Sequence, residues 1–237
     1  MKKLMLGFAA AAALFGAGSV LAGGKPVVAV IEFRNESGAA WWSGGVGWEL
    51  AGLVSNELAA TGDFKVLERS KIEAVLSEQN LAASGRVAAG TGAKIGKLTG
   101  AQYLIAGTVT AYEEDTASTG GGVSFKGISL GGNKSNAYLA VDLRVINATT
   151  GELDFVRTVE GNAKSGGMSI GISRGGFGGA LGKQQKTPAG KAIRAAIIEI
   201  TDYLNCVMVQ RDGCVAEYDA KESRRREKTK GALDLDD

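Results

Sequence analysis

The sequence predicts an α/β domain in which helices pack against a sheet, with two long extended insertions in its second half. Two observations carry this prediction. In the first half, short β-branched runs alternate with segments of helical periodicity, in the order βαβααβ. In the second half, stretches of strict period-two alternation are flanked by segments rich in glycine and serine, residues 118–135 and 165–182.

The first strand and helix are the clearest elements of the first half. The apolar run Val27–Ile31 predicts a strand buried on both faces. A loop over residues 34–45 follows, and it holds Trp41 and Trp42 among small residues. Spacings of three and four then predict an amphipathic helix that ends near Gly62. Its apolar positions are Val46, Leu50, Leu53, Val54 and Leu58.

The rest of the first half predicts two strands and two helices. Residues 64–67 favour a short strand, and residues 103–109 favour a longer one. Between them, Ser70 and Glu73 have the spacing of a capping box, which predicts a helix that starts at Ser70. A second, short helix is predicted over residues 93–98.

The second half contains the extended segments and a final helix. In Ala137–Val145, one face is apolar and the other is mostly polar, as in a strand with one covered face. Asn147–Gly151 predicts a turn, and Thr187 before Pro188 predicts a helix start. That helix carries apolar residues at Ile193, Ile197, Ile200 and Leu204. Residues 216–237 are charged and predict a disordered tail or a frayed helix.

The N-terminus predicts export. Lys2 and Lys3 precede an apolar run over residues 4–15, and Val20–Ala22 has small residues where a signal peptidase cleaves. Residues 1–22 are therefore interpreted as a signal peptide, with a short N-terminal anchor as the alternative. We expect an exported protein in the outer membrane or in the periplasmic space that this membrane bounds.

Charge and composition argue against several function classes. Removing residues 1–22 takes away two of the 27 basic residues, so the mature chain has 25 basic and 25 acidic residues. A neutral mature chain lacks the basic excess that nucleic-acid binding requires, so no nucleic-acid partner is expected. The chain has no histidine, which excludes His-dependent triads and His-ligated metals. We therefore predict no catalytic residues, no cofactor, no metal and no enzyme.

One apparent nucleotide motif fails on spacing. Residues 90–97 resemble a phosphate-binding loop, but the interval between the glycines is one residue too long. Leu98 also stands where a serine or threonine is required.

Two cysteines, Cys206 and Cys214, lie eight residues apart. An even number of cysteines in an exported chain favours one disulfide that closes a short loop. Two unpaired thiols are the alternative.

Several segments of the sequence resemble the CsgG family of curli secretion channels. The resemblance runs from about Val27 to Leu204, and the corresponding domain is predicted over residues 23–215. The matching segments are Val27–Phe33, the loop with Trp41 and Trp42, Phe64–Arg69, Leu98–Tyr103, Leu143–Asn147 and Thr150–Glu152.

The resemblance implies a periplasmic α/β domain similar to anticodon-binding domains. In the family's channel, each subunit extends two β-hairpins, and a ring of subunits closes them into one outer-membrane barrel. These hairpins correspond to residues 116–146 and 155–185. Because a barrel strand of about 9–11 residues crosses the bilayer, Ala137–Val145 is long enough to serve as one. Gly24 stands where the family's lipoprotein has its acylated cysteine, so no lipid anchor is expected.

The resemblance also implies a pore-narrowing loop, which corresponds to Ser37–Ser43. Trp41 and Trp42 are therefore candidate residues of a pore constriction. The alternative for this aromatic pair is packing against the domain itself or against another subunit. Ser37 falls where the channel has a tyrosine.

Two functions follow from the resemblance. In the first, the chain is part of a homo-oligomeric secretion or assembly channel that passes unfolded protein subunits without nucleotide, with periplasmic accessory proteins as partners. In the second, it is a soluble periplasmic binding or adaptor module of the same fold, and it forms no pore.

Overall fold

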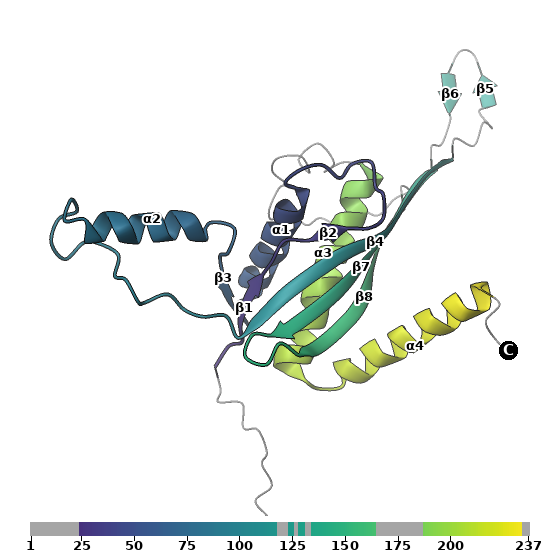
Figure 1. Ribbon diagram of the computed structural model, residues 1–237. Coiled ribbons are helices and arrows are strands. Elements are labelled where there is room, and N and C mark those ends of the chain that lie inside the picture. Colours follow the sequence, from purple (N-terminus) through teal and green to yellow (C-terminus); the bar gives the residue numbers. More distant parts are fainter. Residues whose placement is uncertain (1–23, 118–122, 126–127, 131–133, 165–186, 234–237) are drawn as a thin grey trace, which may run out of the picture.

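The structure is a computed structural model, and it describes residues 24–117, 123–125, 128–130, 134–164 and 187–233. The predicted signal peptide and most of the second predicted hairpin lie outside the described residues. The helices and strands follow one another along the chain as shown in Figure 1. They are β1 (Val27–Val30), β2 (Arg34–Asn35), α1 (Val46–Thr61), β3 (Lys65–Leu67), α2 (Ile72–Ala83), β4 (Tyr103–Ala117), β5 (Val123–Phe125), β6 (Ile128–Leu130), β7 (Lys134–Asn147), β8 (Leu153–Lys164), α3 (Pro188–Asn205), a π-helix (Cys206–Gln210) and α4 (Cys214–Ala232).

One mixed sheet organises the domain, with the strand order β3-β1-β4-β7-β8. β1 pairs in parallel with both β3 and β4, while β4, β7 and β8 form an antiparallel meander. β2 adds a short parallel contact to β4. The sheet therefore joins a parallel half, built through α1, to an antiparallel half whose strands are much longer than the average of about 5–6 residues.

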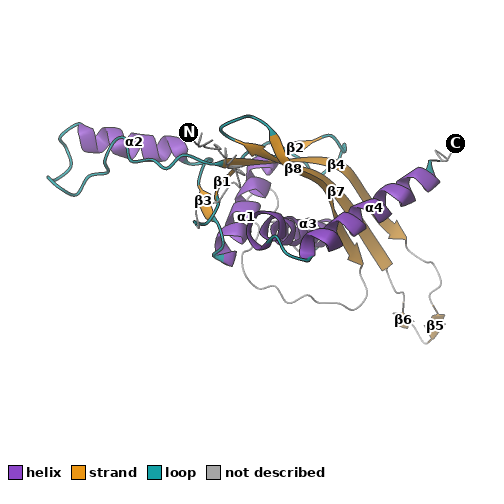
Figure 2. Ribbon diagram, turned by 90° about the horizontal axis from the view of Figure 1, so that it is seen from below, coloured by secondary structure: helices purple, strands orange, loops and turns teal. Residues whose placement is uncertain are grey.

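Helices α1 and α3 cover one face of this sheet, and the core lies between them and the strands (Figure 2). The apolar positions predicted for both helices are buried, apart from the half-buried Leu53. Thr187 caps α3, because its Oγ1 accepts a hydrogen bond from the Gly190 amide at 3.1 Å. The α/β layer, both helices and the α3 cap agree with the prediction.

Two glycines allow the closest approaches in the core. A Cβ atom at Gly161 of β8 would lie 2.1 Å from the Ala192 carbonyl oxygen of α3. A Cβ atom at Gly107 of β4 would lie 2.2 Å from the Phe33 ring. The absence of a side chain at each position therefore sets how near the helix and the ring come to the sheet.

The region between β3 and β4 differs from the prediction. No capping box forms: α2 starts at Ile72, and Ser70 Oγ instead donates to Glu68 Oε1 at 2.6 Å. The short helix expected over residues 93–98 is also absent, since these residues form only turns and irregular structure. Gly96 has a φ of +75°, which interrupts a right-handed helix.

Two further predictions are corrected by the structure. The charged segment expected as a disordered tail or frayed helix forms α4 as far as Ala232. The apolar face of Ala137–Val145 packs in the domain core, with Leu139, Leu143 and Val145 almost fully buried. Helix α3 therefore covers this face, which is not available to lipid. The interpretation of that stretch as a membrane-crossing strand was wrong.

Candidate functional site

Beyond the core, β4 and β7 continue as an antiparallel ribbon, which β8 accompanies as far as Asn136. Their antiparallel register runs from Tyr103 opposite Asn147 to Ala117 opposite Lys134, with an irregularity between Val109 and Ala111. The short strands β5 and β6 form a separate antiparallel pair at the far end of the ribbon (Figure 1). The first predicted hairpin is thus a projection of the sheet itself.

β8 extends in the same direction, and its register with β7 reaches Lys164 opposite Asn136. The return strand of the second predicted hairpin lies in residues 165–186, outside the described residues. Three long strands therefore leave the domain at one end.

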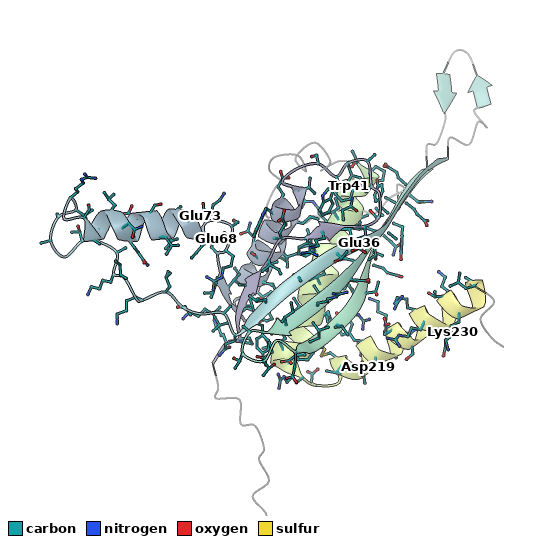
Figure 3. The ribbon with its side chains drawn as sticks, in the orientation of Figure 1. Glu36, Trp41, Glu68, Glu73, Asp219 and Lys230 are labelled. Carbon is teal, nitrogen blue, oxygen red and sulfur yellow. A yellow bond between two sulfur atoms is a disulfide. The ribbon has the colours of Figure 1, made fainter. Side chains whose placement is uncertain are left out.

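The loop with the two tryptophans lies at this same end of the domain, near the root of the ribbon (Figure 3). Its first part is fixed by backbone and side-chain hydrogen bonds. The Glu36 amide donates to the Val109 carbonyl oxygen at 2.8 Å, and Asn35 Oδ1 accepts from the Ser37 hydroxyl at 2.7 Å. The Trp42 amide then donates to the Ala39 carbonyl oxygen at 3.0 Å.

The rings of this loop form a cluster with the ribbon. The Trp41 ring lies 5.7 Å from that of Trp42 and 5.5 Å, edge to face, from that of Tyr112 on β4. The Tyr112 hydroxyl donates to Glu114 Oε2 at 2.6 Å, and burial, followed by this bond, raises the Tyr112 pKa. Both tryptophans are half-buried against the core of their own subunit, and the Trp41 indole nitrogen is buried without a hydrogen-bond partner. The cluster therefore ties the loop to the ribbon.

Helix α4 runs out beside β8, at the edge of the sheet, and borders a groove of about 800 Å³. Tyr138 and Glu160 line it from the strands, and Arg225 and Lys228 line it from α4. The Tyr138 hydroxyl donates to Glu160 Oε1 at 3.0 Å. Burial and the nearby Glu160 carboxylate raise the Tyr138 pKa to about 12, so this hydroxyl keeps its proton at neutral pH.

Arg157 of β8 fastens the start of α4. Its guanidinium lies 5.2 Å from the ring centroid of Tyr203 on α3 and 4.7 Å from that of Tyr218 on α4. Its Nη1 also donates to the Tyr218 carbonyl oxygen at 2.9 Å. The pKa of Tyr218 is raised to about 12, mainly by burial of its hydroxyl group. One cation is thus shared by two aromatic rings, an arrangement that a planar guanidinium suits.

A covalent bond reinforces this attachment. Cys206 in the π-helix and Cys214 at the start of α4 are joined by a disulfide, with their Cα atoms 6.0 Å apart. The turn between them reverses the chain at Arg211, which has a φ of +52°. Together with Arg157, the disulfide fixes the direction in which α4 leaves α3.

The chain matches a family model over nearly its whole length. The model is described as the curli production assembly/transport component CsgG, and it matches residues 11–233. The chain belongs to the CsgG family.

Curated relatives agree with this assignment. The curli production assembly/transport components CsgG of Escherichia coli K12 and Salmonella typhimurium are both 28% identical to this chain over 140 residues. The match covers 55% of this chain and 50% of each relative, so the chain spans about half the length of the curated relatives it matches.

Solved structures with a related arrangement are more distant. A hypothetical protein from Chlamydia trachomatis is 14% identical, with a TM-score of 0.44, and the match covers 77% of this chain and 97% of that one. The PelC dodecamer from Paraburkholderia phytofirmans is 15% identical with a TM-score of 0.35, covering 75% and 86% of the two chains.

Within this CsgG-family chain, the structure brings some predicted residues together and keeps others apart. Trp41 and Trp42 form one cluster at the ribbon root, while Cys206 and Cys214 lie beside α4. The assignment of the tryptophans to a pore constriction stays a prediction, because it concerns the space between subunits. The described residues contain no helix long and apolar enough to cross a membrane. They also contain no cluster of three or more side chains suited to hold a metal ion.

Sequence reasoning missed the Arg157 site and the groove under α4. Arg157 and Tyr218 are separated by 61 residues, and neither belongs to a short motif. The sequence offers one signal, a set of residues at spacings of three and four, which many charged residues surround. The structure shows that these residues form the half-buried stripe of α4. Its members are Val215, Tyr218, Glu222 and Arg225.

Proposed function

We propose that this protein is a subunit of an outer-membrane secretion or assembly channel that resembles the curli export pore. Several copies form a ring, and each contributes the β4–β7 hairpin and a second hairpin that begins with β8. Unfolded protein subunits pass through the ring without nucleotide, and no catalytic step is involved.

The observation that supports this proposal most is the length of the ribbon. Ala137 is the first core residue of β7, yet the ladder with β4 continues beyond it to Lys134. β8 accompanies this projection only as far as Asn136, and so narrow a projection gains little stability in water by itself. Its open edges are unfavourable in lipid. Pairing with the hairpins of neighbouring subunits satisfies those edges, and a closed barrel of such strands crosses a bilayer.

Since Ala137–Val145 packs in the core, we propose a membrane segment further out along the ribbon. Because the inner part of β7 belongs to the core, we propose that the crossing strands lie beyond it, in the section between Glu114 and its partner Ala137. The tryptophan loop at the ribbon root then lies at the periplasmic mouth of the pore. There it would line the path of a translocated chain.

A hairpin-shortened variant tests this function. Asp115 and Asn136 are opposite one another, so a two-residue Asn-Gly turn in place of residues 116–135 closes the ribbon without disturbing the core register. We expect the natural protein to remain with outer membranes after carbonate extraction and to conduct ions in lipid bilayers. The shortened variant should keep the unfolding midpoint of the domain but appear in the soluble periplasmic fraction.

The alternative is a soluble periplasmic adaptor of the same fold, and the packing of Trp41 and Trp42 on their own domain favours it. If the natural protein is recovered as a periplasmic monomer without channel activity, the channel proposal is wrong and the adaptor is supported.

A further inference from the structure

A long arm separates β3 from β4. It consists of α2 and residues 84–100, and it projects away from the sheet (Figure 1). Several large apolar side chains on it are exposed, with Ile95 at 63% and Leu98 at 47% of full exposure. The others are Val75, Leu76 and Leu81. Exposed apolar side chains gathered on one projection are typical of a docking surface.

The arm is folded on itself. Gly92 lies against α2 so closely that a Cβ atom there would be 2.7 Å from the Ala82 Cβ. The loop also contains turns, such as the Thr91 amide bonded to the Ala88 carbonyl oxygen at 3.2 Å. The arm therefore presents its loop with a defined shape.

A second apolar patch is exposed at the opposite edge of the sheet. β8 is an edge strand, and β3, from which the arm departs, is at the other edge. At the start of β8, Leu153 is 53% exposed and Val156 is 59% exposed. Within the part of the chain that the structure describes, both patches are exposed.

The charges of the two patches are opposite. Residues 86–98 of the arm contain three basic residues and no acidic residue, namely Arg86, Lys94 and Lys97. Residues 151–156 contain two acidic residues and no basic residue, Glu152 and Asp154, both exposed. In each segment the charged residues alternate with the apolar side chains. When the two segments meet, an apolar contact and the ion pairs that flank it can therefore form between them at the same time.

The positions of the two patches also agree with a ring. The arm returns to the sheet at Tyr103, which is opposite Asn147 at the end of β7, so both patches lie at the same end of the strands. They lie toward opposite edges, and an interface between different patches of identical subunits is head-to-tail, the kind that closes into rings.

We propose that the arm loop of one subunit docks on the acidic β7–β8 corner, residues 151–156, of the next subunit. Ile95 and Leu98 cover the neighbour's Leu153 and Val156, while Lys94 and Lys97 face its Glu152 and Asp154. This inference rests on the ring of the proposed function and assigns the surfaces that build it.

Charge reversal tests the interface. Lys94→Glu with Lys97→Glu should abolish the oligomer, measured as the mass of the detergent-extracted full-length protein. Adding Glu152→Lys and Asp154→Lys to the same chain restores opposite charges between neighbours and should restore the oligomer. Lys191→Glu with Lys230→Glu makes the same change in net charge on exposed helical positions outside both patches, and this control should leave the oligomer intact.

The outcomes separate this inference from the proposed function. If the natural protein is oligomeric in the membrane and the arm reversal leaves its mass unchanged, or the corner reversal fails to rescue it, the docking assignment is wrong and the channel stands. If the natural protein is a soluble monomer, the proposed function itself fails.

Discussion

Helices α3 and α4 have almost the same length, 18 and 19 residues, but they are attached to the sheet by opposite means. α3 buries ten residues, and its apolar stripe is part of the core. α4 has no fully buried residue and is held by a disulfide, a shared arginine and the ion pair of Lys221 with Glu199 of α3. We therefore expect that the loss of α3 destroys the fold, whereas the release of α4 leaves the rest of the domain folded.

The largest expected effect comes from Gly161→Val, which breaks the attachment of α3. The new side chain would overlap the Ala192 carbonyl, so the helix has to move away from β8. We expect a loss of about 3 kcal/mol in the free energy of unfolding, measured by urea denaturation. As a control, Gly52→Ala in α1 has no atom within 4 Å of the new Cβ and should raise stability by about 0.5–1 kcal/mol. An unchanged midpoint for Gly161→Val would show that α3 tolerates displacement.

Removal of the disulfide should act on α4 far more than on α3. Cys206→Ala with Cys214→Ala releases a short closed loop, which costs about 2 kcal/mol. Amide hydrogen exchange should become faster in α4 and stay slow in α3, because the core contacts of α3 do not depend on the bond. Equal acceleration in both helices would contradict the distinction drawn between them.

Arg157→Lys tests the shared cation. Lysine keeps the charge but loses the planar group that packs against the rings of Tyr203 and Tyr218, so the attachment of α4 should weaken by about 1 kcal/mol. The measurement is again hydrogen exchange, at the first turns of α4. Arg144→Lys on β7 is the matched control, because Arg144 is exposed and should show no change. The same exchange rates in both variants would show that Arg157 does not contribute to the attachment of α4.

Local periodicity explains why α3 and its buried face were predicted from the sequence, whereas residues 216–237 were expected only as a disordered tail or a frayed helix. Ile193, Ile197, Ile200 and Leu204 repeat with the helical period, and the Thr187–Pro188 pair marks the start, so both the helix and its buried face follow from neighbouring residues. α4 depends on partners far away in the chain, since Tyr218 contacts Arg157 of β8. Short-range patterns do not contain that information.

The same reasoning explains the errors around the arm and the ribbon. Ser70 and Glu73 have the spacing of a capping box, but Glu68 Oε1 accepts from both the amide and the hydroxyl of Ser70, so the amide that Glu73 would bond is already engaged. The alternation of Ala137–Val145 correctly predicts a strand with one covered face. It does not distinguish a helix from lipid as the cover, because both favour the same apolar side chains.

The smallest expected effect is a pH dependence at the middle of α4. Hydrogen bonds from Arg225, followed by those from Arg226, lower the pKa of Glu222 from its usual 4.5 to about 2. A carboxyl group whose pKa is lower in the folded state contributes stability above the unfolded pKa and loses it as the pH falls through the folded pKa. The far half of α4 should therefore loosen between about pH 4.5 and pH 2.

The size of this effect is limited because all three side chains are on one helix and partly in water. We expect about 0.5 kcal/mol, visible as faster exchange or lower helicity of α4. Glu222→Gln should remove this pH dependence, whereas Glu227→Gln, at an exposed position five residues further on, should keep it. If α3 loosened over the same pH range as α4, the carboxylate would act on the whole fold, and α4 would no longer be the separately attached helix that its contacts describe.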